Sequence, residues 1–173
     1  MTQYILKLSF DFHQITQTLA HEFLLVEDPN FAGQRPYIPE KDGPLAGTFN
    51  FRKNDEIYIE VVTNTHDFDV SNCTLVSVPA RMTEFISMFD HKSACSTVMD
   101  WGMVQPSSYG SQFSRRSQTP LVVVTQNGQW QISGFLSVDL PAGGATPSED
   151  GRRHQLYYFD PEGSTGTGAG WNF

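Results

Sequence analysis

Short segments in which apolar and polar residues alternate place the strongest constraint on how this chain can fold. Near the N-terminus the even positions from Leu6 to Phe12 are apolar, whereas Lys7, Ser9 and Asp11 between them are polar. Successive side chains of a β-strand point to opposite faces of a sheet. The pattern therefore predicts a strand with one buried face.

Similar segments recur along the whole chain and are separated by residues that favour turns. Further strands are expected at 23–26, 48–52, 57–63, 70–78, 97–104, 121–125, 129–138 and 154–159. Most of the 14 glycines and 10 prolines lie between these segments. Many short strands rich in β-branched and aromatic residues, with turn formers between them, favour an all-β domain.

Two turns are expected to join strands into hairpins. Asn54-Asp55 lies between 48–52 and 57–63, and Asn127-Gly128 lies between 121–125 and 129–138. Such pairs are typical of tight turns between antiparallel strands. Because a parallel sheet needs helical crossovers, we expect an antiparallel β-sandwich of about eight strands, jelly-roll or immunoglobulin-like.

One short helix is expected beside the strands. Met82, Phe85, Ile86 and Phe89 have the spacing of one helix face, which predicts a helix over 81–89. Residues 13–22 fit a helical turn or a loop equally well. We expect residues 1–163 to form a single β-sandwich domain, followed by a flexible glycine-rich tail at 164–173.

The charge and the apolar runs exclude several classes of protein. The chain has 173 residues and a formal net charge of −8, so a nucleic-acid backbone would repel its surface. No apolar run approaches the length that spans a bilayer. Since Lys7 interrupts the apolar N-terminus, no signal peptide is expected and the sequence predicts a cytoplasmic protein without nucleic-acid or membrane partners.

The sequence carries no familiar catalytic or cofactor motif. It lacks the nucleophile elbow, the phosphate-binding loop, the dinucleotide fingerprint and the zinc-protease motif. Its two cysteines, Cys73 and Cys95, are far apart and fit buried thiols, although a disulfide stays open. We therefore expect no cofactor, no metal centre and no enzymatic activity. A hydrolase or isomerase site assembled only by folding remains open, for example one joining His66 or His154 to carboxylates.

A small set of residues is the best candidate for ligand binding. Aromatic rings in expected loops can stack on a sugar or anchor a partner, and turn carboxylates can hold calcium. The candidates are Tyr37, His66, Asp67, Asp69, Trp101 and Tyr109. This set predicts, as an alternative function, a lectin-like carbohydrate-binding module that calcium could assist.

The order of features resembles one known family. An N-terminal strand, an expected hairpin from Phe49 to Ile57, and an aromatic strand that runs through Tyr157-Tyr158-Phe159 into Asp160-Pro161-Glu162 are similar to the bacterial AidA/PixA proteins. The resemblance implies a cytoplasmic protein of similar length with no established enzymatic role, found in inclusion bodies of some species. With five methionines, the chain departs from the methionine-rich members of that family, which bears on self-assembly.

The first hypothesis is therefore a non-enzymatic β-sandwich that acts by binding a protein partner or by self-association. Excess acidic charge keeps copies of a chain apart, whereas open edge strands can pair between copies. Self-assembly should then strengthen as salt rises, or as the pH falls toward the isoelectric point near 4.9.

Overall fold

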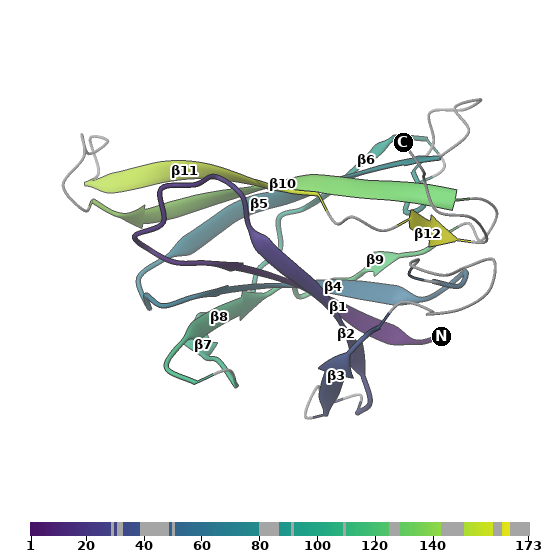
Figure 1. Cartoon of the computed structure of the whole chain (residues 1–173), viewed down its shortest axis with the longest axis horizontal. Helices are drawn as coiled ribbons and strands as arrows, with labels where there is room; N and C mark the ends of the chain where they lie inside the picture. Colours follow the sequence, from purple (N-terminus) through teal and green to yellow (C-terminus); the bar gives the residue numbers. More distant parts are fainter. Residues whose placement is uncertain are drawn as a thin grey trace.

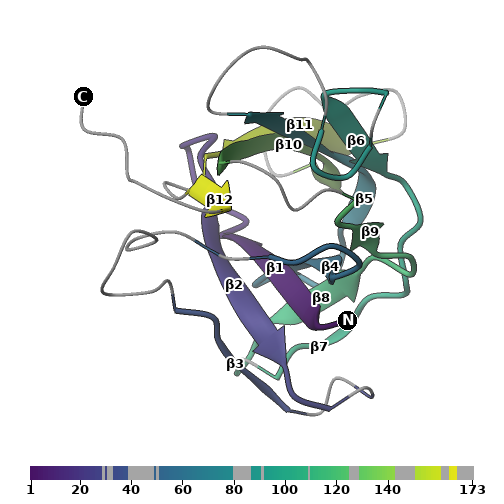
Figure 2. The same cartoon turned by 90° about the vertical axis from the view of Figure 1, so that its right-hand side faces the viewer.

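Two β-sheets stacked face to face make up the computed structural model of the chain (Figures 1 and 2). The structure describes residues 1–28, 30, 33–38, 49, 51–79, 87–90, 92–108, 110–124, 129–142, 151–160 and 164–166. These residues form twelve strands and no helix. The expected all-β, sandwich-like fold is confirmed.

The first sheet has seven strands. Its order is β3 (Gln34–Pro36), β2 (Ala20–Val26), β1 (Gln3–Phe10), β4 (Glu56–Thr63), β8 (Phe113–Arg116) and β7 (Gln105–Pro106), with β9 (Leu121–Val122) also paired to β4.

One pair in this sheet corrects the expectation of a purely antiparallel sandwich, because β1 and β4 run parallel, with Leu6 opposite Ile59. The chain leaves β1, forms β2 and β3, and returns over a long connection before β4 begins. Such a connection allows parallel neighbours, which a tight turn does not.

The second sheet has five strands and is antiparallel throughout. Its order is β11 (Arg152–Phe159), β10 (Gln129–Pro141), β5 (Asp69–Pro79) and β6 (Cys95–Val98), and β12 (Ser164–Gly166) pairs with the first residues of β10. β12 lies in the segment expected to be a flexible tail. Residues 161–163 and 167–173 lie outside the described residues, so the division into a domain and a tail stays a prediction.

Both expected hairpins are wrong. The turn at Asn54 forms, with a φ of 71° and a 2.9 Å hydrogen bond from the Asp55 N–H to the Arg52 carbonyl, but β4 pairs with β1, β8 and β9 instead of with residues 48–52. Asn127-Gly128 lies outside the described residues. β9 and β10, on either side of it, belong to different sheets. The chain therefore crosses between the layers where a hairpin was expected.

The expected helix at 81–89 is not seen. Residues 80–86 lie outside the described residues, and Met88 and Phe89 form a bend. The Phe89 N–H donates to Ser87 Oγ, and the Met88 N–H donates to Ser77 Oγ of β5. Because Met88 and Phe89 are both buried in the core, their apolar character reflects packing between the sheets instead of one helix face.

The core fills the space between the two sheets with alternate side chains from each. Phe10 of β1 stacks on Tyr157 of β11, with ring centroids 4.8 Å apart. Gly134 of β10 leaves room for the Phe159 ring, because a Cβ built there would lie 2.4 Å from Phe159 Cζ. Close packing of this kind fixes the register of β10 against β11.

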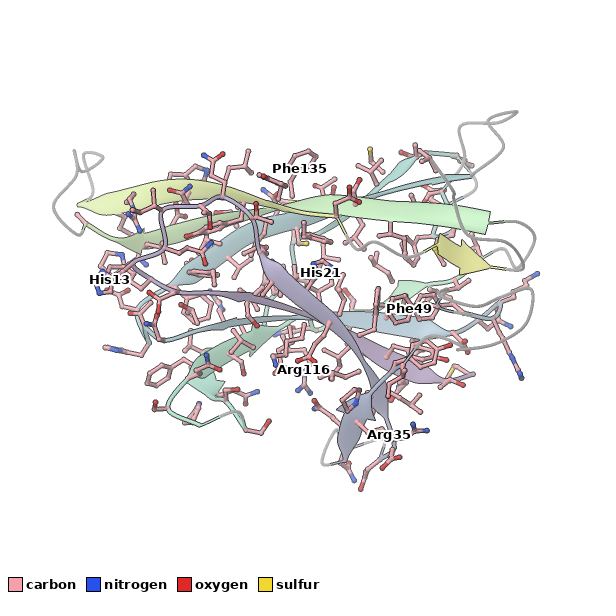
Figure 3. All side chains as sticks on the ribbon, viewed as in Figure 1. His13, His21, Arg35, Phe49, Arg116 and Phe135 are labelled. Atoms are coloured by element: carbon pink, nitrogen blue, oxygen red, sulfur yellow. The ribbon has the colours of Figure 1, made fainter. Side chains whose placement is uncertain are left out.

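The outer face of the first sheet carries a row of alternating charges across four strands. Glu22 of β2 lies opposite Lys7 of β1, Lys7 opposite Glu60 of β4, and Glu60 opposite Arg116 of β8. Figure 3 shows Arg116 on the side of this sheet that faces away from the second sheet. Cross-strand neighbours of opposite charge stabilise a pairing. The row therefore supports the register of the first sheet.

The described part of the chain holds no helix with the length and apolar character needed to cross a membrane. Cys73 and Cys95 are both free thiols. Cys73 is buried as expected, but Cys95 is exposed on β6, which corrects the expectation that both are buried.

Candidate functional site

Two candidate carboxylates near the start of β5, Asp67 and Asp69, each pair with an arginine. Arg152 Nη1 is 3.0 Å from Asp67 Oδ1, and Arg115 Nη1 forms an ion pair with Asp69 Oδ1. The His66 ring contacts the Phe113 ring of β8 at a centroid distance of 5.7 Å. Both carboxylates are thus compensated by guanidinium groups, which weakens their attraction for calcium.

Trp101 is linked to Asp69 through Arg115. Arg115 Nε donates to the carbonyl of Gly102 at 2.8 Å while its Nη1 pairs with Asp69. Burial lowers the pKa of the Arg115 guanidinium, which is nevertheless cationic at neutral pH. Phe113 and Arg115 of β8 thus contact His66 and Asp69, whereas Trp101 forms an isolated bridge with Ser117 and packs against the core.

The remaining candidates do not join this group. Tyr37 packs against Tyr4 and Phe51, at the end of β1 opposite to Phe10. Tyr109 lies outside the described residues. Within the described ranges, no three His, Cys, Asp or Glu side chains are grouped as a metal site. A calcium-assisted, glycan-binding role for the set stays a prediction.

A polar cluster on the outer face of the second sheet was not among the sequence candidates. Ser137 Oγ is 3.0 Å from His154 Nε2, and His154 Nδ1 is 2.6 Å from Asp139 Oδ1. Ser71 Oγ donates to Asp139 Oδ2 at 3.1 Å. We call these four residues the His154 cluster. Ser137 is only 5% exposed, whereas the His154 side chain is 62% exposed, so solvent reaches the cluster from the histidine side.

Strand register brings the His154 cluster together. Asp139 of β10 is the direct cross-strand partner of His154 on β11, and Ser137 lies two residues before Asp139 on the same face. A β-bulge in the pairing of β5 with β10 inserts Ser71 between the partners of Ser137 and Val138. Bulges re-aim side chains, and here Ser71 reaches Asp139. The sequence indicated only that folding could join His154 to carboxylates, and it did not point to Ser71, Ser137 or Asp139.

Apolar side chains surround the cluster on the same outer face. Leu156 is the partner of Ser137 on β11, and Phe135 and Tyr158 are partners of each other on β10 and β11. All three are about half exposed. Figure 3 shows Phe135 on the side of the second sheet that faces away from the first. The outer face of the second sheet thus combines polar residues that hydrogen-bond one another with exposed apolar surface.

The outermost strands of the two sheets differ in how well their open edges are protected. β3 contains Pro36 and β7 contains Pro106, and proline offers no N–H to a further strand. The outer edge of β11 is covered near Tyr158, whose N–H donates to the Gln17 carbonyl at 2.8 Å and whose carbonyl accepts from Leu19. Short strands, prolines and such cover are ways to prevent edge pairing.

β6 is also short, but within the described residues it has no proline and no such cover. Its four residues, Cys95, Ser96, Thr97 and Val98, include no proline and no charge. In the part of the chain that the structure describes, β5 is the only strand paired with β6. Cys95 and Thr97 are exposed, and Met99, which follows the strand, is 73% exposed. Figure 2 places β6 at the margin of the second sheet.

Comparison with known proteins found no matching family model, no similar curated protein and no similar solved structure. The resemblance to the AidA/PixA proteins therefore stays a prediction.

Proposed function

We propose that this protein acts by self-association, and that β6 is the strand through which two copies join. The proposal rests on one observation, which is that the edge strands of the two sheets differ in their protection against pairing. β3 and β7 each contain a proline and β11 is covered near Tyr158, whereas β6 has neither charge nor proline along its length. An unprotected edge strand is a template for pairing with another chain.

The occupant is a second copy of the same chain, since an antiparallel pair of identical strands is self-complementary. A twofold axis beside β6 would let the backbone of each β6 supply the N–H and C=O groups that the other requires. The two five-stranded sheets would then form one continuous sheet. Exposed Thr97 and Cys95 side chains would meet their counterparts on one face of it.

The net charge of the chain opposes association through surfaces other than β6. With a net charge of −8, two copies repel each other at long range, and only an uncharged contact avoids further cost. β6 supplies such a contact. Self-association through β6 is thus expected to be weak and sensitive to salt.

Sedimentation velocity over a concentration series tests the proposal. The variant Thr97→Lys places a charge on the exposed face of the edge strand, where lysine blocks pairing. We expect association at least about tenfold weaker than in the unchanged chain, about 1.4 kcal/mol.

Thr16→Lys is the matched control, because Thr16 is an exposed loop residue and the change in net charge is the same. It should keep most of the association. A monomer at every concentration of the unchanged chain, or equal weakening by both variants, would overturn the proposal. Near-ultraviolet circular dichroism shows that each variant keeps its fold.

Three finer assignments are also proposals. A jelly-roll or immunoglobulin-like topology, a cytoplasmic location and membership of the AidA/PixA family fit a self-associating β-sandwich and are part of this proposal. A calcium-assisted lectin remains the alternative. A glycan array probed with and without chelator tests it, and binding that chelator abolishes would favour it.

A further inference from the structure

The His154 cluster has the connectivity of a nucleophile, a base and an orienting carboxylate. Ser137 Oγ contacts His154 Nε2 at 3.0 Å, and Asp139 Oδ1 contacts Nδ1 at 2.6 Å. This order of groups activates a serine hydroxyl for acyl transfer, whatever fold presents it. We propose that Ser137 is the nucleophile of an ester-hydrolysing site on the outer face of the second sheet.

Two further contacts hold the base in position. Asp139 Oδ2 accepts a hydrogen bond from Ser71 Oγ, and Arg152 Nη2 donates to the Asp139 carbonyl at 3.0 Å. With its carboxylate fixed, Asp139 accepts a hydrogen bond from the Nδ1–H group of His154. The Nε2 lone pair then faces the Ser137 hydroxyl, which is the tautomer that a general base requires.

Asn72 supplies a donor for the oxyanion of the acyl-transfer step. It is the partner of Ser137 on β5 and follows Ser71 at the bulge. Cross-strand partners share a face, so Asn72 neighbours Ser137 on the side away from Leu156 and its amide is within reach of a ligand bound at Ser137. Side-chain amides serve as oxyanion donors in acyl transfer, and their loss typically costs about 10²- to 10³-fold in turnover.

The surrounding side chains indicate the substrate class. Leu156 is the other partner of Ser137, and the pair of Phe135 and Tyr158 continues the exposed apolar surface along both strands. An ester whose acyl chain is apolar can rest on this surface while its carbonyl lies between Ser137 and Asn72. The site therefore fits short apolar acyl esters better than charged ones.

The reaction is hydrolysis and consumes one water molecule. Ser137 Oγ bonds to the acyl carbon as its proton moves to His154 Nε2, and the bond from that carbon to the alcohol oxygen then breaks. The alcohol leaves with the proton from His154. Water next attacks the acyl-serine with His154 as base, which releases the carboxylic acid and restores the Ser137 hydroxyl.

A fluorophosphonate probe and p-nitrophenyl butyrate test the inference on the intact chain. Intact-mass measurement should find one phosphonyl group on the unchanged chain and none on Ser137→Ala. Butyrate hydrolysis should fall at least about 10²-fold in Ser137→Ala. Ser133→Ala is the control, because Ser133 lies on the same strand and face and belongs to no part of the His154 cluster. It should label and hydrolyse as the unchanged chain does.

The variant Asp139→Asn tests whether Asp139 positions His154 for catalysis or only stabilises the fold. Because the amide no longer orients and stabilises the imidazolium, turnover should fall and the acidic limb of its pH profile should move, while near-ultraviolet circular dichroism stays unchanged. An unchanged chain that takes up no probe, or Ser137→Ala labelled to the same extent, would overturn the inference. Thr97→Lys, which should weaken self-association, should take up the fluorophosphonate probe as the unchanged chain does. This test is therefore independent of the test of self-association.

Discussion

Glu60 of β4 and Arg116 of β8 are cross-strand partners that form an ion pair, with 3.1 Å between Glu60 Oε1 and Arg116 Nη2. Glu60 is only 3% exposed, and among the described residues its Oε2 has no hydrogen-bond partner. A buried carboxylate depends on its partner far more than a surface carboxylate does. The stability of the first sheet therefore depends on the cations that flank Glu60, Arg116 on one side and Lys7 on the other.

Arg116→Met should lower the free energy of unfolding by up to about 3–5 kcal/mol, because it removes the ion-pair partner of a buried carboxylate and leaves only Lys7 opposite Glu60. The double variant Glu60→Gln, Arg116→Met should recover much of that loss. Urea unfolding measures both. Arg35→Met is the control, since Arg35 pairs with Glu27 at an exposed site and its loss should cost less than about 1 kcal/mol. Equal and additive losses at the two positions would contradict this account.

Gly134→Ala should destabilise the second sheet by about 1–3 kcal/mol, because the new Cβ would lie 2.4 Å from Phe159 Cζ and 2.7 Å from the Thr74 carbonyl oxygen. Gly33→Ala is the matched control, because its Cβ would meet only Glu27 Cβ, at an ordinary 3.6 Å. Thermal unfolding of the two variants compares them directly. If Gly134→Ala melts at the same temperature as Gly33→Ala, the packing described for β10 is wrong.

Stability should fall as the pH rises above about 9. Burial raises the pKa of the Cys73 thiol and, with the nearby Tyr37 and Asp55, the pKa of Tyr4, from usual values of 9.0 and 10.0. The folded chain keeps these protons where the unfolded chain has lost them. The unfolded state is thereby favoured at high pH, and the contribution present below pH 9 is lost.

Urea unfolding at about pH 8 and about pH 10.5 measures this loss, and Tyr4→Phe should reduce it by removing one of the groups. If the free energy of unfolding stays constant or rises over this range, folding does not raise the pKa of either group.

Self-association should strengthen with salt. The −8 charge repels approaching copies, and the screening length falls from about 10 Å at 0.1 M salt to about 3 Å at 1 M. Light scattering at constant protein concentration should report a larger mean mass as salt rises, and again as the pH approaches 4.9. A mean mass that decreases with salt would instead indicate a contact between opposite charges.

Local patterns predicted the strands well and their partners poorly. Alternation alone located β1, β5 and β11, because each has one buried and one exposed face. The hairpin expected at Asn127-Gly128 failed because turn chemistry does not determine which sheet a strand joins. The parallel pairing of β1 with β4 likewise depends on a connection through β2 and β3.

The functional residues were harder to find for the same reason. Asp139 and His154 meet only through the register of β10 and β11, and Ser71 reaches them only because of a bulge. The sequence indicated His154 only as a residue that folding could join to a carboxylate. The candidates His66, Asp67 and Asp69 were chosen by their place in a turn, which cannot reveal that arginines from β8 and β11 lie beside the two carboxylates.

Amide hydrogen exchange of β6 as a function of protein concentration tests self-association through this strand most directly. Edge amides that face solvent in the monomer should exchange more slowly once a second β6 pairs with them. The account predicts that exchange in the peptide containing residues 95–98 slows as concentration rises, while exchange in the peptide containing β3 does not. Exchange of residues 95–98 that is unchanged at concentrations where the mean mass doubles would contradict it.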